Sequence, residues 1–189
     1  ILYGDPQLHG IFLAHPTSKS VCVLLVTPLF EEKRCAHRTL IMCGRALARA
    51  GAAVLIPDLY GTGNSAGSLT EISLERWLGD LNAAAEMLSV RGKGPLYVVA
   101  CRAGALLAAH AIAHGLPAKR LLLWQPISSG QQYLSQLRTR RVIQDNITGE
   151  KPPEIGKYEV EGQHLSPELY SELEGLSMPA APPVPDIRL

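Results

Sequence analysis

Four short apolar runs, separated by helical patterns, constrain the fold of this chain more than any other feature. Residues 21–27, which read VCVLLVT, form an unbroken apolar run before Pro28. Such runs are typical of strands buried on both faces of a sheet. Similar runs follow at 53–57, 96–100 and 121–124. The alternation of strand and helix predicts the α/β class, a mostly parallel sheet with right-handed crossovers and helices on both faces.

The segments between these runs have the spacing of amphipathic helices. We expect helices at 35–50, 73–89 and 103–114. Ser73 is placed to cap the second helix, and Gly115 follows the third. The sequence therefore predicts one helix in each crossover of the sheet.

Three regions are expected along the chain. Residues 1–130 would form the α/β core, with an edge strand at 8–15. Residues 131–178 are more polar and would form a cap-like excursion from the core. Residues 179–189 are rich in proline and resemble a lead into a further core strand, so we expect the fold to be truncated at its C-terminal end.

Within the excursion, a short strand is expected at 158–161, and Ser166 followed by Pro167 is a typical helix start. The excursion also carries three arginines, which we interpret as a solvated face: Arg138, Arg140 and Arg141.

Composition excludes several classes of function. The formal net charge of the 189 residues is +1, so a nucleic acid or an anionic membrane is not an expected partner. No apolar run reaches the roughly 18 residues that span a bilayer, and residues 1–10 lack the pattern of a signal peptide. None of the cysteines forms a Cys-x-x-Cys pair, so we expect buried free thiols, with no disulfide, metal or other cofactor. They are Cys22, Cys35, Cys43 and Cys101.

The ends of three predicted strands carry a family resemblance. They are Thr-Pro-Leu at 27–29, Asp-x-x-Gly-x-Gly-x-Ser at 58–65 and Ala-Cys-Arg-Ala-Gly at 100–104. In this order they resemble the α/β-hydrolase superfamily across about 1–127. The excursion then falls where that superfamily inserts its cap. We interpret the glycine-rich loop at 58–65 as a structural turn.

More narrowly, the chain resembles the hydrolase 2 family associated with the exosortase A system, which accompanies bacterial exopolysaccharide and PEP-CTERM sorting loci. The closer match is carried by segments 28–32, 58–61, 65–67, 102–108 and 122–126. In that family an Arg also stands at the elbow. The resemblance implies a bacterial, cytoplasmic protein and a hydrolase of ester or thioester bonds.

Arg102 occupies the position at which the Gly-x-Ser-x-Gly elbow of the superfamily carries its nucleophilic serine. Ala100 and Gly104 fill the two small flanking positions. A guanidinium group stays protonated near neutral pH and cannot serve as an acyl-transfer nucleophile. Cys101 precedes the apex, so we expect its side chain to point into the sheet as an inert thiol.

A cation at a helix N-terminus is unfavourable unless an anion neutralises it. An internal partner would be Glu31 or Glu32, from the loop that supplies half of the oxyanion hole in the superfamily. An external partner would be a carboxylate or phosphate, held by Arg102 and the backbone N–H groups of Leu29 and Ala103. The two alternatives are compatible, since a ligand can displace a glutamate.

Two hypotheses about function follow. The first is a hydrolase acting on an ester or acyl substrate, which rests on the resemblance. The second is a catalytically inactive α/β-hydrolase-like protein that binds an anionic ligand or partner at the elbow. The acid and histidine of the superfamily would lie beyond residue 189. In that case the strand at 121–124 is an open edge, which a second subunit of a homo-oligomer or a swapped segment would cover.

Overall fold

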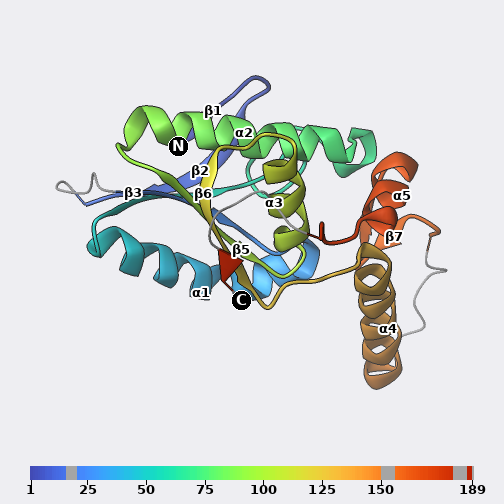
Figure 1. The fold of residues 1–189 in the computed structure, drawn as a ribbon. Coiled ribbons are helices and arrows are strands. Elements are labelled where there is room, and N and C mark those ends of the chain that lie inside the picture. The colour runs from blue at the N-terminus through green and yellow to red at the C-terminus, as the bar shows by residue number, and fades with distance from the viewer. Residues whose placement is uncertain (16–20, 150–155, 181–186, 189) are drawn as a thin grey trace.

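A seven-stranded sheet organises the computed structural model, which describes residues 1–15, 21–149, 156–180 and 187–188 (Figure 1). The strand order is β1-β2-β4-β3-β5-β6-β9. β2 runs antiparallel to both its neighbours, and the other pairs are parallel. The strands are β1 Leu2–Tyr3, β2 Leu8–Leu13, β3 Val21–Val26, β4 Ala52–Pro57, β5 Leu96–Cys101, β6 Ala118–Trp124 and β9 Ile187–Arg188. The predicted fold class, α/β with a mostly parallel sheet, is confirmed.

Helices cover both faces of the sheet, as alternation along β3 requires. Val23 and Leu25 belong to the core beneath one face, which α1 (Phe30–Arg49) covers. Leu24 belongs to the core on the opposite face, beneath α2 (Leu74–Arg91) and α3 (Gly104–Ala113). Figure 1 shows α1 on one side of the sheet and α2 with α3 on the other.

Two predictions about sheet edges are wrong. Residues 8–15 do not form an edge strand, because β1 adds to β2 with Tyr3 opposite Leu8. The strand predicted at 121–124 is not an open edge either. β9 pairs with β6, placing Ile187 opposite Leu121, so this edge gives no reason to expect a partner subunit. Of the proline-rich segment, 181–186 and 189 lie outside the described residues.

After β6 the chain leaves the sheet and forms two helices and a hairpin, which we call the insertion. The elements are α4 Gly130–Thr148, β7 Glu159–Val160, β8 Gln163–His164 and α5 Pro167–Gly175. In Figure 1, α4 and α5 lie together at one end of the sheet. The short strand expected at 158–161 corresponds to β7. Residues 150–155 lie outside the described part of the chain.

Buried hydrogen bonds attach the insertion to the core. Ser166 caps α5 by accepting from the N–H of Leu169 at 2.9 Å, and its hydroxyl donates to the Ile72 carbonyl at 2.5 Å. Glu172 of α5 accepts from the N–H of Leu74, the first residue of α2, at 2.6 Å. The cap of α2 therefore comes from Glu172, since the side chain of Ser73 makes no capping bond.

Candidate ligand-binding site at the elbow

The turn between β5 and α3 has the strained backbone of a nucleophile elbow, and Arg102 is its apex. Its φ is +54°, a value that non-glycine residues rarely adopt. Neighbouring strands and turns fix this conformation. The Arg102 N–H donates to the Trp124 carbonyl at 3.1 Å, and the Arg102 carbonyl accepts from the N–H of Ile127 at 3.3 Å.

Gly104 allows the elbow to lie against the end of β3. A Cβ atom at this position would overlap the Thr27 carbonyl oxygen. α3 therefore begins closer to the sheet than any side chain would permit. Gly104 therefore serves the close strand–helix approach expected of a small flanking residue, and a role of Gly104 in binding stays a prediction.

The side chain of Arg102 pairs with Glu32. Its Nε and Nη2 atoms lie 3.3 and 3.0 Å from the two carboxylate oxygens, the fork geometry that arginine forms with a planar anion. Glu31, the alternative partner, instead pairs with Arg34 at the surface. Of the two glutamates considered from the sequence, the structure brings only Glu32 to the Arg102 side chain.

Glu32 also accepts a second guanidinium, from Arg140 of α4, at 3.1 Å. The Glu32 side chain is only 11% exposed. Burial alone would raise its pKa, but hydrogen bonds and charge from Arg102 and Arg140 together hold the pKa below its ordinary value. Glu32 is therefore an ionised carboxylate shared by the elbow and the insertion.

The network continues to the hairpin between β7 and β8. Arg140 lies 3.5 Å from Glu161, whose other carboxylate oxygen accepts from the N–H of Glu31 at 3.1 Å. Burial raises the pKa of Glu161 above its ordinary value, against the opposing effects of the Glu31 N–H and Arg140.

The side chain of Arg140 is exposed, as the interpretation of a solvated face expects, and it also pairs with Glu32 and Glu161. Arg141 pairs with Asp145 on its own helix. Arg138 donates to the Lys157 carbonyl. All three are engaged by nearby oxygens, but of these contacts only the one from Arg140 to Glu32 reaches the core.

The two expected oxyanion donors belong to Leu29 and Ala103, both of which are buried. Neither backbone N–H makes a hydrogen bond with the described part of the chain. The Leu29 carbonyl, by contrast, accepts from the hydroxyl of Tyr133 in α4 at 3.3 Å. Neither amide therefore has an internal acceptor in the described part of the chain.

Cys101 lies in the core on the α1 side of the sheet. Burial raises the pKa of its thiol, with the charge of Arg102 acting in the opposite direction, so a nucleophilic thiolate is disfavoured there. The four cysteines are free, but the expectation that all are buried is wrong. Cys35 is exposed, and Cys43 is half-buried at the margin of the core that α1 covers.

A pocket of about 400 Å³ lies beside the elbow, between α1 and the ends of β5 and β6. Arg102 and Glu32 line its charged side, and Trp124, Leu40 and Pro28 contribute apolar surface. Pro28 also lines a second pocket, of about 820 Å³, across the β3–α1 loop. Both pockets lie at the carboxyl ends of parallel strands, where ligands bind in open α/β sheets.

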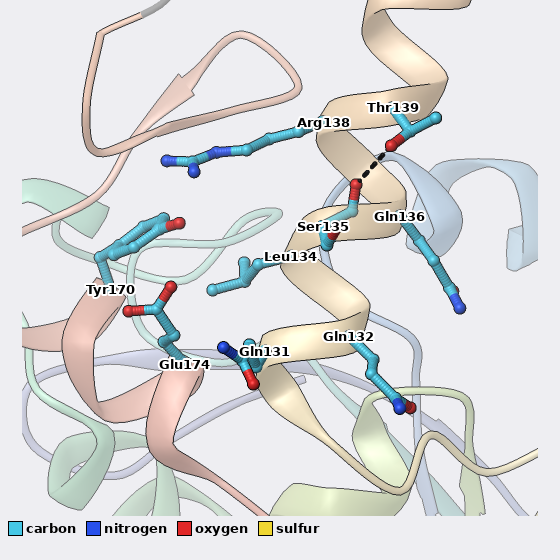
Figure 2. Close-up of a pocket in the computed structure, with 9 residues that line it drawn as sticks. All are labelled: Gln131, Gln132, Leu134, Ser135, Gln136, Arg138, Thr139, Tyr170 and Glu174. Carbon is cyan, nitrogen blue, oxygen red and sulfur yellow. Dashed lines mark hydrogen bonds between the residues drawn. The ribbon is translucent and has the colours of Figure 1, made fainter.

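Figure 2 shows a third pocket, of about 580 Å³, between α4 and α5. Leu134 and Arg138 extend from α4 toward Tyr170 on α5. Arg138 is already engaged there. Its guanidinium lies 5.2 Å from the centre of the Tyr170 ring and donates to a backbone carbonyl. The guanidinium that this pocket would offer a ligand is therefore already partly occupied.

A charged cluster around Asp58 was not evident from the sequence. Its carboxylate lies 2.6 Å from Lys33 and 3.0 Å from the His9 ring, and it accepts from the N–H of Asn64 at 3.1 Å. Burial would raise the Asp58 pKa, but Lys33 and the hydrogen bonds lower it. The interpretation of this loop as a structural turn agrees with the positive φ of Gly63, +57°. Its partners come from β2 and α1, so residue spacing could not reveal them.

Solved structures of similar architecture include α/β hydrolases. An α/β serine hydrolase without a lid, from Xanthomonas campestris, is 24% identical with a TM-score of 0.55, over 65% of this chain and 58% of that one. Est1E from Butyrivibrio proteoclasticus, solved with ferulic acid bound, is 20% identical with a TM-score of 0.56, over 74% and 56%. An α/β hydrolase from Sphaerobacter thermophilus is 21% identical with a TM-score of 0.51, over 92% and 63%.

These likenesses establish that the chain has the α/β-hydrolase fold. It spans about three fifths of the length of the solved structures just described. No protein-family model and no curated protein sequence matches it. Among the described residues, no helix is both long enough and apolar enough to cross a membrane.

Proposed function

We propose that this chain is an α/β-hydrolase-like protein that binds an anionic ligand at its elbow through Arg102, and that it lacks serine-dependent hydrolase activity. Its resemblance to the exosortase A-associated hydrolase 2 family supports a role in the bacterial exopolysaccharide and sorting system, in the cytoplasm. The ligand would be a small molecule carrying a carboxylate or phosphate.

One observation carries the proposal: backbone strain is concentrated around the elbow. In the described residues, four non-glycine positions have positive φ, and they are Phe30, Arg102, Gln125 and Glu161. Arg102 and Gln125 line the elbow pocket, Phe30 begins α1, and Glu161 belongs to the ion network. Such conformations cost about 1–3 kcal/mol each and cluster at functional sites. Their shared location supports a binding role for the side chains that they present.

The available donors support an anion as the ligand. Glu32 engages Nε and Nη2 of Arg102 but no contact of Nη1 is found among the described residues. The Arg102 side chain is 27% exposed, so a ligand can reach it from the pocket. We propose that this guanidinium and the amides of Leu29 and Ala103, which have no internal acceptor among the described residues, bind one negative group.

Titration of the full-length protein with butyrate and with inorganic phosphate tests this function. The backbone amide resonances of Leu29 and Ala103 should shift, and Arg102→Ala should abolish the shifts. Arg34→Ala, which removes an exposed arginine at the surface, is the matched control and should leave them unchanged. Binding that survives Arg102→Ala would refute the proposal.

A second candidate, hydrolysis of an ester or thioester, is supported by the likeness to serine hydrolases. Under the binding proposal, serine-directed phosphonates should not label the wild-type protein, and p-nitrophenyl esters should not be turned over. Turnover by the wild type that is lost in Arg102→Ala would favour the hydrolase. Turnover gained in Arg102→Ser would instead indicate a disabled site with intact surroundings.

A further inference from the structure

Glu161 stands out because its backbone conformation suits its residue type poorly. It is the first of the two residues that connect β7 to β8, and both have positive φ, +50° at Glu161 and +81° at Gly162. Two-residue turns of this kind favour Asn or Asp before Gly, since those side chains tolerate the left-handed region. A glutamate there indicates that its longer side chain has a role which offsets the strain.

That side chain places a carboxylate at the start of α1. Only 9% of it is exposed. One oxygen accepts from the N–H of Glu31, in the first turn of the 20-residue helix, and the other faces Arg140. Arg140 in turn shares Glu32 with Arg102. An amide donor and a guanidinium next to the elbow are therefore already occupied by an anion from the hairpin.

We propose that the Glu161 carboxylate is an internal competitor, which holds the insertion against the elbow until a ligand carboxylate displaces it. This inference rests on the proposed anion-binding function of Arg102. Displacement of Glu161 frees the Glu31 amide and the Nη1 group of Arg140, while Nη2 of Arg140 stays paired with Glu32. The same contact explains why α1 begins at Phe30 although the cap residue Leu29 has no side-chain acceptor.

The internal anions also indicate the class of ligand. Arg102 holds Glu32 through two parallel contacts, one to each oxygen, which is the arrangement for a planar carboxylate. Glu161 likewise divides its two oxygens between an amide and a guanidinium. A carboxylate is the group that already occupies both arrangements, so it is the anion that these donors accept within the protein. The assigned ligand class is a small carboxylate, since the elbow pocket measures about 400 Å³.

Glu161→Gln in the full-length protein tests the competitor, with butyrate as the probe and the Glu31 and Ala103 amide resonances as the readout. Removal of the competing charge should tighten butyrate binding about tenfold, because a larger fraction of the protein is then open to ligand. Glu159→Gln is the matched control on the same hairpin, and it should leave affinity unchanged. Glu161→Asp keeps the charge but shortens the side chain, and it should give an intermediate affinity.

The outcomes separate this inference from the proposed function. If Glu161→Gln binds butyrate no more tightly than the wild type while Arg102→Ala still abolishes binding, the competitor is refuted and the anion receptor stands. If butyrate shifts no resonance in any variant, including a Glu161→Gln protein with an unchanged unfolding midpoint, the proposed function itself fails. Tighter binding of inorganic phosphate than of butyrate would overturn the carboxylate assignment.

Discussion

The elbow and the insertion meet at one site, but different interactions hold them there. The elbow is fixed by backbone packing so close that Gly104 has no room for a methyl group against Thr27. The insertion reaches the elbow through charged pairs, with Arg140 at 3.1 Å from Glu32 and 3.5 Å from Glu161. Packing of the first kind tolerates no change of volume. Charged contacts of the second kind respond to pH, salt and competing anions, so the insertion is the adjustable half of the site.

The largest effect is expected from Gly104→Ala. The added methyl group overlaps the Thr27 carbonyl, so α3 must move away from β3, and we expect a loss of about 3 kcal/mol or more in the free energy of unfolding. Urea denaturation measures it. Gly79→Ala is the control on an open side of α2, where the added methyl group would meet no atom within 4 Å beyond its own helix backbone, and it should stabilise by up to about 1 kcal/mol. Equal effects of the two substitutions would remove the packing argument.

The next largest effect tests how firmly the insertion is attached to the core. Ser166→Ala removes both the cap of α5 and the buried bond to Ile72, which should cost about 2 kcal/mol. Ser129→Ala removes only the exposed cap of α4, through Gln132, and should cost about 1 kcal/mol or less. If Ser166→Ala lowers the thermal unfolding midpoint no more than Ser129→Ala does, the insertion is held mainly by other contacts.

A smaller effect is expected where the two regions share a charge. Glu32→Gln leaves Arg102 and Arg140 without their common carboxylate, and partial exposure of both arginines limits the loss to about 1–2 kcal/mol. Glu31→Gln breaks only the surface pair with Arg34, and no change in the unfolding midpoint is expected. A large effect of Glu31→Gln, or no effect of Glu32→Gln, would contradict the assignment of Glu32 as the buried partner of the two arginines.

The smallest effects concern pH. The pKa values of Glu32 and Asp58 are lowered in the folded protein. The stability that these two carboxylates contribute is therefore complete above their ordinary values of 4.5 and 3.8, and it is lost as pH falls through the lowered values. The pKa of Glu161 is raised, so its contribution has the opposite sign, and stability is gained as pH falls through the raised value. Thermal melts from neutral to acidic pH should lose less stability on acidification in Asp58→Asn than in the wild type. An unchanged profile would contradict the role of Lys33 and His9 as partners of Asp58.

The elbow could be predicted from the sequence, whereas much of the contact between the insertion and the elbow could not. The apolar runs determine the strands because burial on both faces leaves no polar position. The elbow is recognisable within the five residues 100–104, from Ala100, Arg102 and Gly104. Glu161 contacts the Glu31 amide across 130 positions, and no local pattern encodes such a pairing. The early start of α1 at Phe30 has the same origin, since part of its first turn is satisfied by the hairpin.

The central claim is that the Arg102 side chain extends from the elbow to the Glu32 carboxylate. A double-mutant cycle of Arg102→Ala and Glu32→Ala, followed by urea denaturation, measures this pairing directly. The structure predicts a coupling free energy of about 1–2 kcal/mol, because Glu32 is nearly buried and Arg102 only partly exposed. A coupling below about 0.3 kcal/mol, within the additivity of independent sites, would contradict it.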